Sequence, residues 1–172
     1  KMIGQTVIAL VFGILALSPM LEDENHRAPA SHQISFIKDI GWALPGVLVL
    51  VVIWFLVVGF SNAVNLTDGL DGLAAGCSAI VLLSFTAMTF ITDGAGQADL
   101  ALLCACLVGA CVGFLWFNSF PAAVFMGDTG SLALGGGLGI MAVLIHQPLV
   151  LVIAGGVFVA EGLSVLLQTG YF

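Results

Sequence analysis

Residues 61–72 read Ser-Asn-Ala-Val-Asn-Leu-Thr-Asp-Gly-Leu-Asp-Gly and place two amides and two carboxylates in a chain that is otherwise almost free of charge. The polar positions Asn62, Asn65, Asp68 and Asp71 recur at every third residue. Because residues three apart are neighbours on a helix, this spacing predicts one continuously polar helix face. Carboxylates at the end of a membrane helix are costly unless they bind something. The segment therefore predicts a functional site, with a solvated acidic loop as the alternative.

The composition around this segment is that of a polytopic membrane protein. Of the 172 residues, 60% are hydrophobic and only 8% are Asp, Glu, Lys or Arg, and the mean hydropathy is +1.20. A soluble domain of this size cannot hide so much apolar surface in one core. The net charge of -7 argues against a nucleic acid partner, since a phosphate backbone needs a basic surface. All the cysteines lie inside apolar runs, which predicts buried hydrophobes rather than metal ligands.

Apolar runs of roughly the length that crosses a bilayer follow one another along the chain. We predict an all-α fold, a polytopic integral membrane protein in which residues 1–172 form a single transmembrane domain. The predicted spans are residues 2–21, 43–60, 74–92, 100–117, 132–145 and 149–169. The polar connection 22–41 is expected to hold a small hairpin or a surface helix.

A second polar motif lies between the fourth and fifth predicted spans. Residues 118–131 read Asn-Ser-Phe-Pro-Ala-Ala-Val-Phe-Met-Gly-Asp-Thr-Gly-Ser. Two crossings separate it from the first motif, so both motifs are expected on the same membrane face. Lys1 falls on that face and Arg27 and Lys38 on the other, so the few positive charges do not favour a cytoplasmic position for the motifs.

The residue types in the two motifs suit a magnesium–phosphate site. The carboxylates have no lysine or arginine within either motif, so a cation is expected to supply the positive charge. Hard oxygen ligands favour Mg²⁺, which binds one or two carboxylates together with substrate phosphates. Asp128 lies just before a predicted span, where free N–H groups and the helix dipole favour a phosphate. Asn118 and Phe125 offer an amide and an aromatic ring to a base.

These two motifs, together with residues 161–172, closely resemble signatures of the bacterial phospho-N-acetylmuramoyl-pentapeptide transferases, which belong to the polyprenyl-phosphate N-acetylhexosamine-1-phosphate transferases. The resemblance implies a ten-helix family fold, of which this chain would cover about six helices. Because the sequence starts at Lys1 and stops soon after a helix, we expect a fragment lacking both ends. The family's paired-aspartate motif would then precede Lys1, and its histidine-rich motif would follow Phe172.

The resemblance also implies a reaction and a set of roles. Undecaprenyl phosphate would attack UDP-MurNAc-pentapeptide to give lipid I and UMP, with Mg²⁺ required, on the cytoplasmic face of a bacterial plasma membrane. By motif position, Asp128 and Asp68 would be the catalytic carboxylates and the metal ligands. A homodimer is a further expectation. The residues implied to bind the substrate are Asn65, Gly69, Leu70, Asp71, Asn118 and Phe125, with the ring of Phe125 stacked on uracil.

The sequence is also compatible with three other functional interpretations. Within the superfamily, the alternative is a UDP-GlcNAc:polyprenyl-phosphate GlcNAc-1-phosphate transferase. From a different class, the alternative is an ion-coupled transporter that uses Asp68, Asp71 and Glu161 as a carboxylate relay. A third alternative is a chain that keeps the fold without activity. Glu161, about midway along the last predicted span, is expected either near a lipid groove or as a structural hydrogen-bonding residue.

Overall fold

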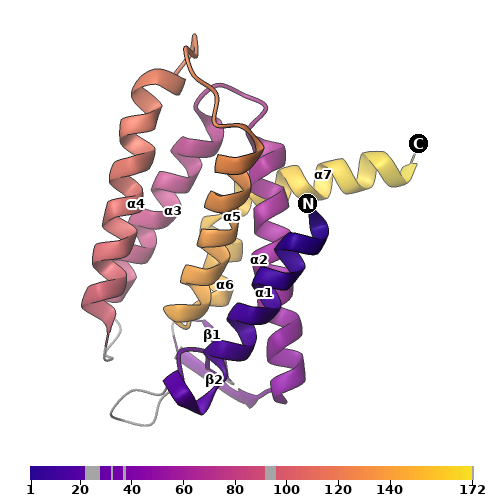
Figure 1. The fold of residues 1–172 in the computed structure, drawn as a ribbon, viewed down its shortest axis with the longest axis vertical. Coiled ribbons are helices and arrows are strands. Elements are labelled where there is room, and N and C mark those ends of the chain that lie inside the picture. Colours follow the sequence, from indigo (N-terminus) through magenta and orange to yellow (C-terminus); the bar gives the residue numbers. More distant parts are fainter. Residues whose placement is uncertain (22–27, 32, 37, 92–95, 172) are drawn as a thin grey trace.

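The computed structural model describes residues 1–21, 28–31, 33–36, 38–91 and 96–171, and the described part is a bundle of helices with one small hairpin (Figure 1). The hairpin lies in the polar connection, where a hairpin or a surface helix was expected. The elements are α1 (Met2–Ala16), a 3-10 turn η1 (Pro19–Leu21), β1 (Gln33–Phe36), β2 (Lys38–Ala43), α2 (Gly46–Thr67), α3 (Leu73–Thr89), α4 (Gln97–Asn118), α5 (Gly127–Leu144), α6 (Pro148–Ala154) and α7 (Gly156–Tyr171).

The predicted class, an α-helical polytopic membrane protein, is confirmed. Among the described residues, α2, α4 and α5 are long and apolar enough to cross a membrane, and the bent pair α6 and α7 adds a fourth candidate span. The helices α1 and α3 are apolar but shorter, with 15 and 17 residues. By this length test, the described residues give up to four spans instead of the predicted six.

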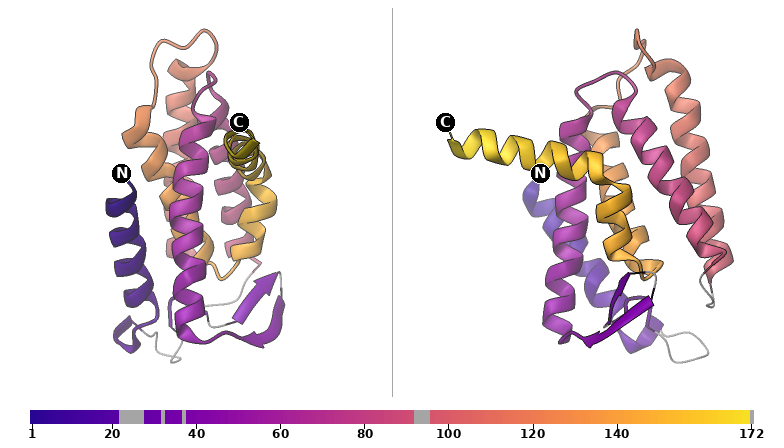
Figure 2. Two further views of the ribbon diagram at one scale, coloured as in Figure 1. Left: turned by 90° about the vertical axis from the view of Figure 1, so that its right-hand side faces the viewer. Right: turned by 180° about the vertical axis from the view of Figure 1, so that it is seen from behind.

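The last predicted span, residues 149–169, is wrong as a continuous helix. The chain bends by 77° between α6 and α7, and α7 projects sideways from the bundle (Figure 2). A Cβ at Gly155 would lie only 2.7 Å from the carbonyl oxygen of Leu151 and 2.9 Å from the ring of Phe60. A glycine here lets the ring of Phe60 pack into the break, and sharp kinks are common at glycine pairs such as Gly155 and Gly156.

Two helices extend further than their apolar runs. The span predicted over residues 43–60 is the helix α2, which continues to Thr67 and includes Asn62 and Asn65. The helix α5 begins at Gly127, so Asp128 lies in its first turn. The predicted bounds differ because hydropathy indicates only the part of a helix that lies in the hydrocarbon layer, whereas the helical backbone can continue beyond that layer. The predicted polar face is shorter than expected, because α2 ends before Asp68.

The packing of α2 against α5 brings two backbones into direct contact. A Cβ at Gly135 would lie 2.8 Å from Cα of Ser61, and one at Gly139 would lie 2.9 Å from Cα of Val57. Four residues forward on α5 correspond to four residues back on α2, so the helices run antiparallel in a fixed register. In a membrane, such close packing of small residues takes the place of the hydrophobic effect in holding helices together.

Both polar motifs lie at the same end of the bundle, as predicted. Figure 1 shows the α2–α3 and α4–α5 connections at one end and the hairpin and the α5–α6 turn at the other. The two motif connections also bond to each other, because the backbone N–H of Ala122 donates to Asp71 at 3.0 Å. In Figure 2 the first residue of α1 lies toward the motif end and α1 runs alongside α2.

A substitution in the glycine contact tests the packing of α2 and α5. Gly135→Ala is expected to lower the stability of the full-length protein by about 1–3 kcal/mol, because the added methyl group overpacks a backbone contact. The matched control is Gly137→Ala, since a Cβ there meets no atom within 4 Å. Thermal unfolding in mild detergent gives the comparison, and equal melting temperatures for the two variants would contradict this packing.

Cysteine labelling tests the arrangement of the two motifs. In the full-length protein without its native cysteines, single cysteines at Gly69 and Ala123, both exposed, are expected to react from the same side of the membrane. A cysteine at Ile91, which is 78% exposed and lies two residues beyond the end of α3, should react from the opposite side. Labelling of Gly69→Cys and Ala123→Cys from different sides would refute the shared face.

Candidate functional site

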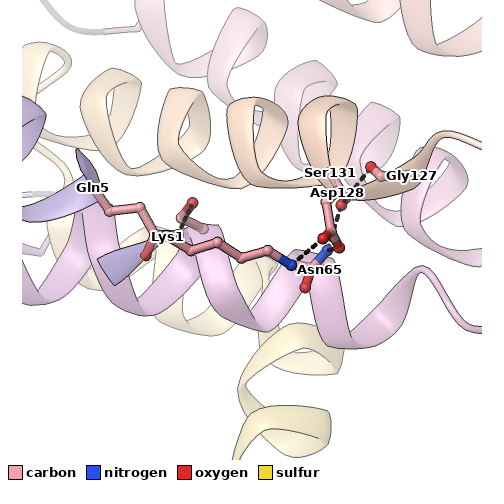
Figure 3. A network of polar contacts seen from close by, with 7 residues as sticks. Lys1, Gln5, Asn65, Gly127, Asp128 and Ser131 are labelled. Carbon is pink, nitrogen blue, oxygen red and sulfur yellow. Dashed lines mark hydrogen bonds and ion pairs between the residues drawn. The ribbon is translucent and has the colours of Figure 1, made fainter. Parts of the chain in front are cut away.

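Asp128 is the centre of a polar network between α2 and α5 (Figure 3). The Asn65 amide donates one hydrogen bond of 2.8 Å to Oδ1 of Asp128 and another of 2.8 Å to the hydroxyl of Ser131. Ser131 in turn donates to the carbonyl oxygen of Gly127 at 2.9 Å. Asn65 lies in the last turns of α2, and Asp128 lies in the first turn of α5. The antiparallel register of these two helices brings the two side chains together.

Lys1 forms an ion pair with Oδ2 of the same carboxylate. The side chains are 60% and 53% exposed, so solvent reaches the pair and another cation can compete for the carboxylate. The ion pair was not predicted from the sequence, because neither motif contains a lysine or arginine and Lys1 is far from Asp128 along the chain. The count of predicted spans could have indicated it, because that count places Lys1 on the same membrane face as the two motifs.

Asp68 lies at the C-terminal end of α2, beside Asp128. Burial raises the pKa of the Asp68 carboxyl above its ordinary value, a hydrogen bond from the backbone N–H of Gly127 opposes this, and the charge of Asp128 raises the pKa further. The two carboxylates therefore repel one another through space, as expected for a site that binds a cation.

The donor set of this site fits a magnesium ion held jointly with a substrate. Within the described residues, no group of three or more histidine, cysteine, aspartate and glutamate side chains gathers closely enough to hold a metal ion. Asp68 and Asp128 form a pair of hard oxygen donors. Because Mg²⁺ commonly binds one or two carboxylates and takes its other ligands from phosphates and water, a pair is sufficient for that mode.

Asp71 and Asn118 join the two motif connections to each other. Oδ2 of Asp71 accepts a hydrogen bond from the N–H of Ala122 at 3.0 Å. The Asn118 amide accepts from the N–H of Gly72 at 3.0 Å and donates to the carbonyl oxygen of Val124 at 2.9 Å. Asn118 is buried, and its side chain holds the α2–α3 connection against the α4–α5 connection. This role was not predicted from the sequence, and direct contact of either residue with a nucleoside stays a prediction.

The remaining predicted binding residues lie on the surface of the same two connections. The side chains of Leu70 and Phe125 are 67% and 68% exposed, and Gly69 is also exposed. The exposed aromatic ring of Phe125 and the exposed side chain of Leu70 leave apolar surface available to a planar ligand. Their contact with a uridine stays a prediction.

Glu161 lies outside this network. It is partly exposed and lies shortly after the break, on α7, which passes α2 near Ala63. The sequence placed it midway along a continuous span, but the bend puts it near the start of a separate helix. A carboxylate relay through the membrane needs acids deep within spans. Asp68 and Asp71 instead lie at one end of the bundle, which disfavours the transporter alternative.

Comparison with known proteins agrees with the two motifs. The model of glycosyl transferase family 4 matches residues 1–146. A protein of Nocardioides sp. named phospho-N-acetylmuramoyl-pentapeptide-transferase is 52% identical over the whole chain and 52% of its own length. Proteins of the same name from Methylacidiphilum infernorum and Opitutus terrae are 44% and 54% identical, over 100% and 79% of this chain.

The relatives also give the scale of the match. The chain spans about half the length of the curated relatives it matches, with 50% of the Methylacidiphilum protein and 39% of the Opitutus protein covered. The resemblance inferred from residues 61–72 and 118–131 is confirmed by the shared name of these relatives. With a family model over most of its residues, the chain belongs to glycosyl transferase family 4.

Proposed function

We propose that the full-length protein containing this chain transfers phospho-MurNAc-pentapeptide from UDP-MurNAc-pentapeptide to undecaprenyl phosphate, which gives lipid I and UMP. The observation that carries the proposal is the Asn65–Asp128 contact, which joins the two motifs beside Asp68 at one end of the helix bundle (Figure 1). A site at helix ends suits a reaction between a water-soluble nucleotide and a membrane lipid. Relatives that carry the transferase name support this substrate pair over the UDP-GlcNAc alternative.

The reaction exchanges one phosphoanhydride bond, P–O–P, for another. An oxygen of the lipid phosphate bonds to the sugar-side phosphorus, and the bond from that phosphorus to the bridging oxygen breaks, so UMP leaves with the electron pair. Asp128 and Asp68 would hold Mg²⁺. When bound, Mg²⁺ would neutralise the pyrophosphate and stabilise the charge that develops on the leaving UMP.

The other residues of the site bind and orient. Asn65 holds one oxygen of Asp128, so the carboxylate keeps a fixed orientation. Lys1 pairs with the other oxygen and can neutralise Asp128 before the substrates arrive. Asp71 and Asn118 keep the two connections together and thus keep Phe125 and Leu70 on one surface, where the uridine is proposed to bind.

The proposed setting is the bacterial plasma membrane, with the site facing the cytoplasm. A UDP-linked substrate is charged and does not cross a bilayer, so its site has to face the compartment that supplies it. The proposal rests on the charge of the substrate and not on the positive side chains, since Lys1 lies at the motif end but Lys38 lies in the hairpin at the other end. Assembly as a homodimer stays a prediction, because the contacts described here lie within one chain.

The role of Phe125 in nucleotide binding can be tested in the full-length protein. Phe125→Ala is expected to weaken binding of UMP or a uridine inhibitor by about 1–3 kcal/mol, the value of a base stack on an aromatic ring in single-strand binding proteins. Titration calorimetry measures this directly. Phe90→Ala is the control, since Phe90 is also exposed but lies at the far end of α3. Unchanged affinity in Phe125→Ala would exclude the stack.

Asp128→Asn tests the proposed metal ligand, because it keeps the size of the side chain and removes the charge. Turnover in a lipid I assay across a Mg²⁺ titration is expected to be abolished in the full-length protein. Binding of a uridine inhibitor should change much less, since other residues are proposed to hold the base. Asp99→Asn is the matched control, because Asp99 is an exposed acid in the first turn of α4. Near-normal turnover with an unchanged Mg²⁺ requirement would rule out this role for Asp128.

A further inference from the structure

The hydroxyl of Ser131 occupies a position between the two helices that form the site. Its side chain is fully buried, at 0% exposure, one turn along α5 from Asp128. It donates to the carbonyl oxygen of Gly127 at 2.9 Å, so its own proton is already used. Toward Asn65, 2.8 Å away, the oxygen can therefore only accept a hydrogen bond.

Two acceptors then determine how the Asn65 amide is oriented. The NH₂ group of Asn65 has two hydrogens, and the structure gives one to Ser131 and the other to Oδ1 of Asp128, each at 2.8 Å. Turning the amide over would point its carbonyl oxygen at an ionised carboxylate and at an oxygen whose proton is engaged. That orientation is unfavourable, so Ser131 and Asp128 together hold the NH₂ group in place (Figure 3).

The held amide makes the two oxygens of Asp128 unequal. Oδ1 is occupied by Asn65, and Oδ2 is paired with the ammonium group of Lys1. Asn65 makes no hydrogen bond to Oδ2, and it is this oxygen that pairs with the positive charge of Lys1. A cation that displaces Lys1 would therefore meet Oδ2 in a defined direction.

We propose that Ser131 is a positioning residue for the cation site, which fixes the Asn65 amide so that Asn65 holds Oδ1 of Asp128 and presents Oδ2 to a divalent cation. This inference rests on the proposed function in taking Asp128 as the metal ligand. Ser131 itself touches neither substrate nor metal in this proposal. Groups that orient a metal ligand typically change metal affinity by about 10–100-fold when they are removed.

The test measures binding of Mn²⁺, used as a probe for Mg²⁺, to the full-length protein without substrates. Electron paramagnetic resonance reports the free Mn²⁺ during a titration. Ser131→Ala is expected to weaken Mn²⁺ binding by about 10-fold. Ser84→Ala is the matched control, since Ser84 also donates to the carbonyl oxygen four residues earlier, Ile80, but lies on α3 away from Asp128. Mn²⁺ affinity in this control should equal that of the unaltered protein.

A double substitution separates positioning from simple helix packing. If Ser131 acts through Asn65, Ser131→Ala should have no further effect on Mn²⁺ binding in an Asn65→Ala background. A residue that only packs α5 against α2 would lower the melting temperature and leave Mn²⁺ binding unchanged in the folded protein. Unchanged binding in Ser131→Ala, or additive effects of Ser131→Ala and Asn65→Ala, would overturn the inference.

Two further outcomes are also decisive. If Ser131→Ala does not fold, Ser131→Cys takes its place with the same criteria, because a thiol has a similar size and is a much weaker acceptor. Failure of the unaltered protein to bind Mn²⁺ would overturn the inference, since no cation would then need Asp128. Mn²⁺ binding without sugar-phosphate transfer would overturn only the proposed function, because the binding measurement uses no substrate.

Discussion

The close approach of α2 and α5 is the constraint on which the site depends. Gly139 lies against Val57 and Gly135 against Ser61, and the next step in the same register brings Ser131 to Asn65. Each step moves four residues back along α5 and four forward along α2. A change of register by one residue would rotate Asn65 by about 100° and break its bond to Asp128. The glycines in the apolar part of the bundle therefore help to determine the geometry of a polar site that lies about one to three turns away along α5.

The two carboxylates differ in their partners, in their burial and in the helix end at which they lie. Hydrogen bonds from Lys1 and Asn65 and the charge of Lys1 hold the pKa of Asp128 below its ordinary value. Asp128 is in the first turn of α5, where the positive end of the helix dipole stabilises a negative charge. Asp68 follows the last turn of α2, where the dipole has the opposite sign. Burial and the charge of Asp128 also raise the pKa of Asp68. Asp68 is thus the carboxylate that gains most from a bound cation, while Asp128 is negative already and attracts one.

Composition and motif spacing predicted the membrane class and the shared end of the two motifs, because both follow from long apolar runs and from counting crossings. Details that depend on packing were not predictable in this way. Hydropathy does not reveal the break at Gly155, where the ring of Phe60 from a different helix packs against the backbone. Residues far apart in sequence are joined by the ion pair of Lys1 and by the hydrogen bonds of Asp71 and Asn118. The direct roles proposed for the site residues stay predictions.

Phe60 links the site to the bend in the last helices. Its backbone carbonyl faces Gly135 on α5, and its ring lies against Gly155, between α6 and α7. The same residue therefore contributes to the register that aligns Asn65 with Asp128 and to the break that directs α7 away from the bundle. Because the backbone of Phe60 cannot shift without carrying its ring, a change in the α2–α5 contact also reaches the bend. The α2–α5 contact that aligns the site and the packing at the bend therefore share one residue, Phe60.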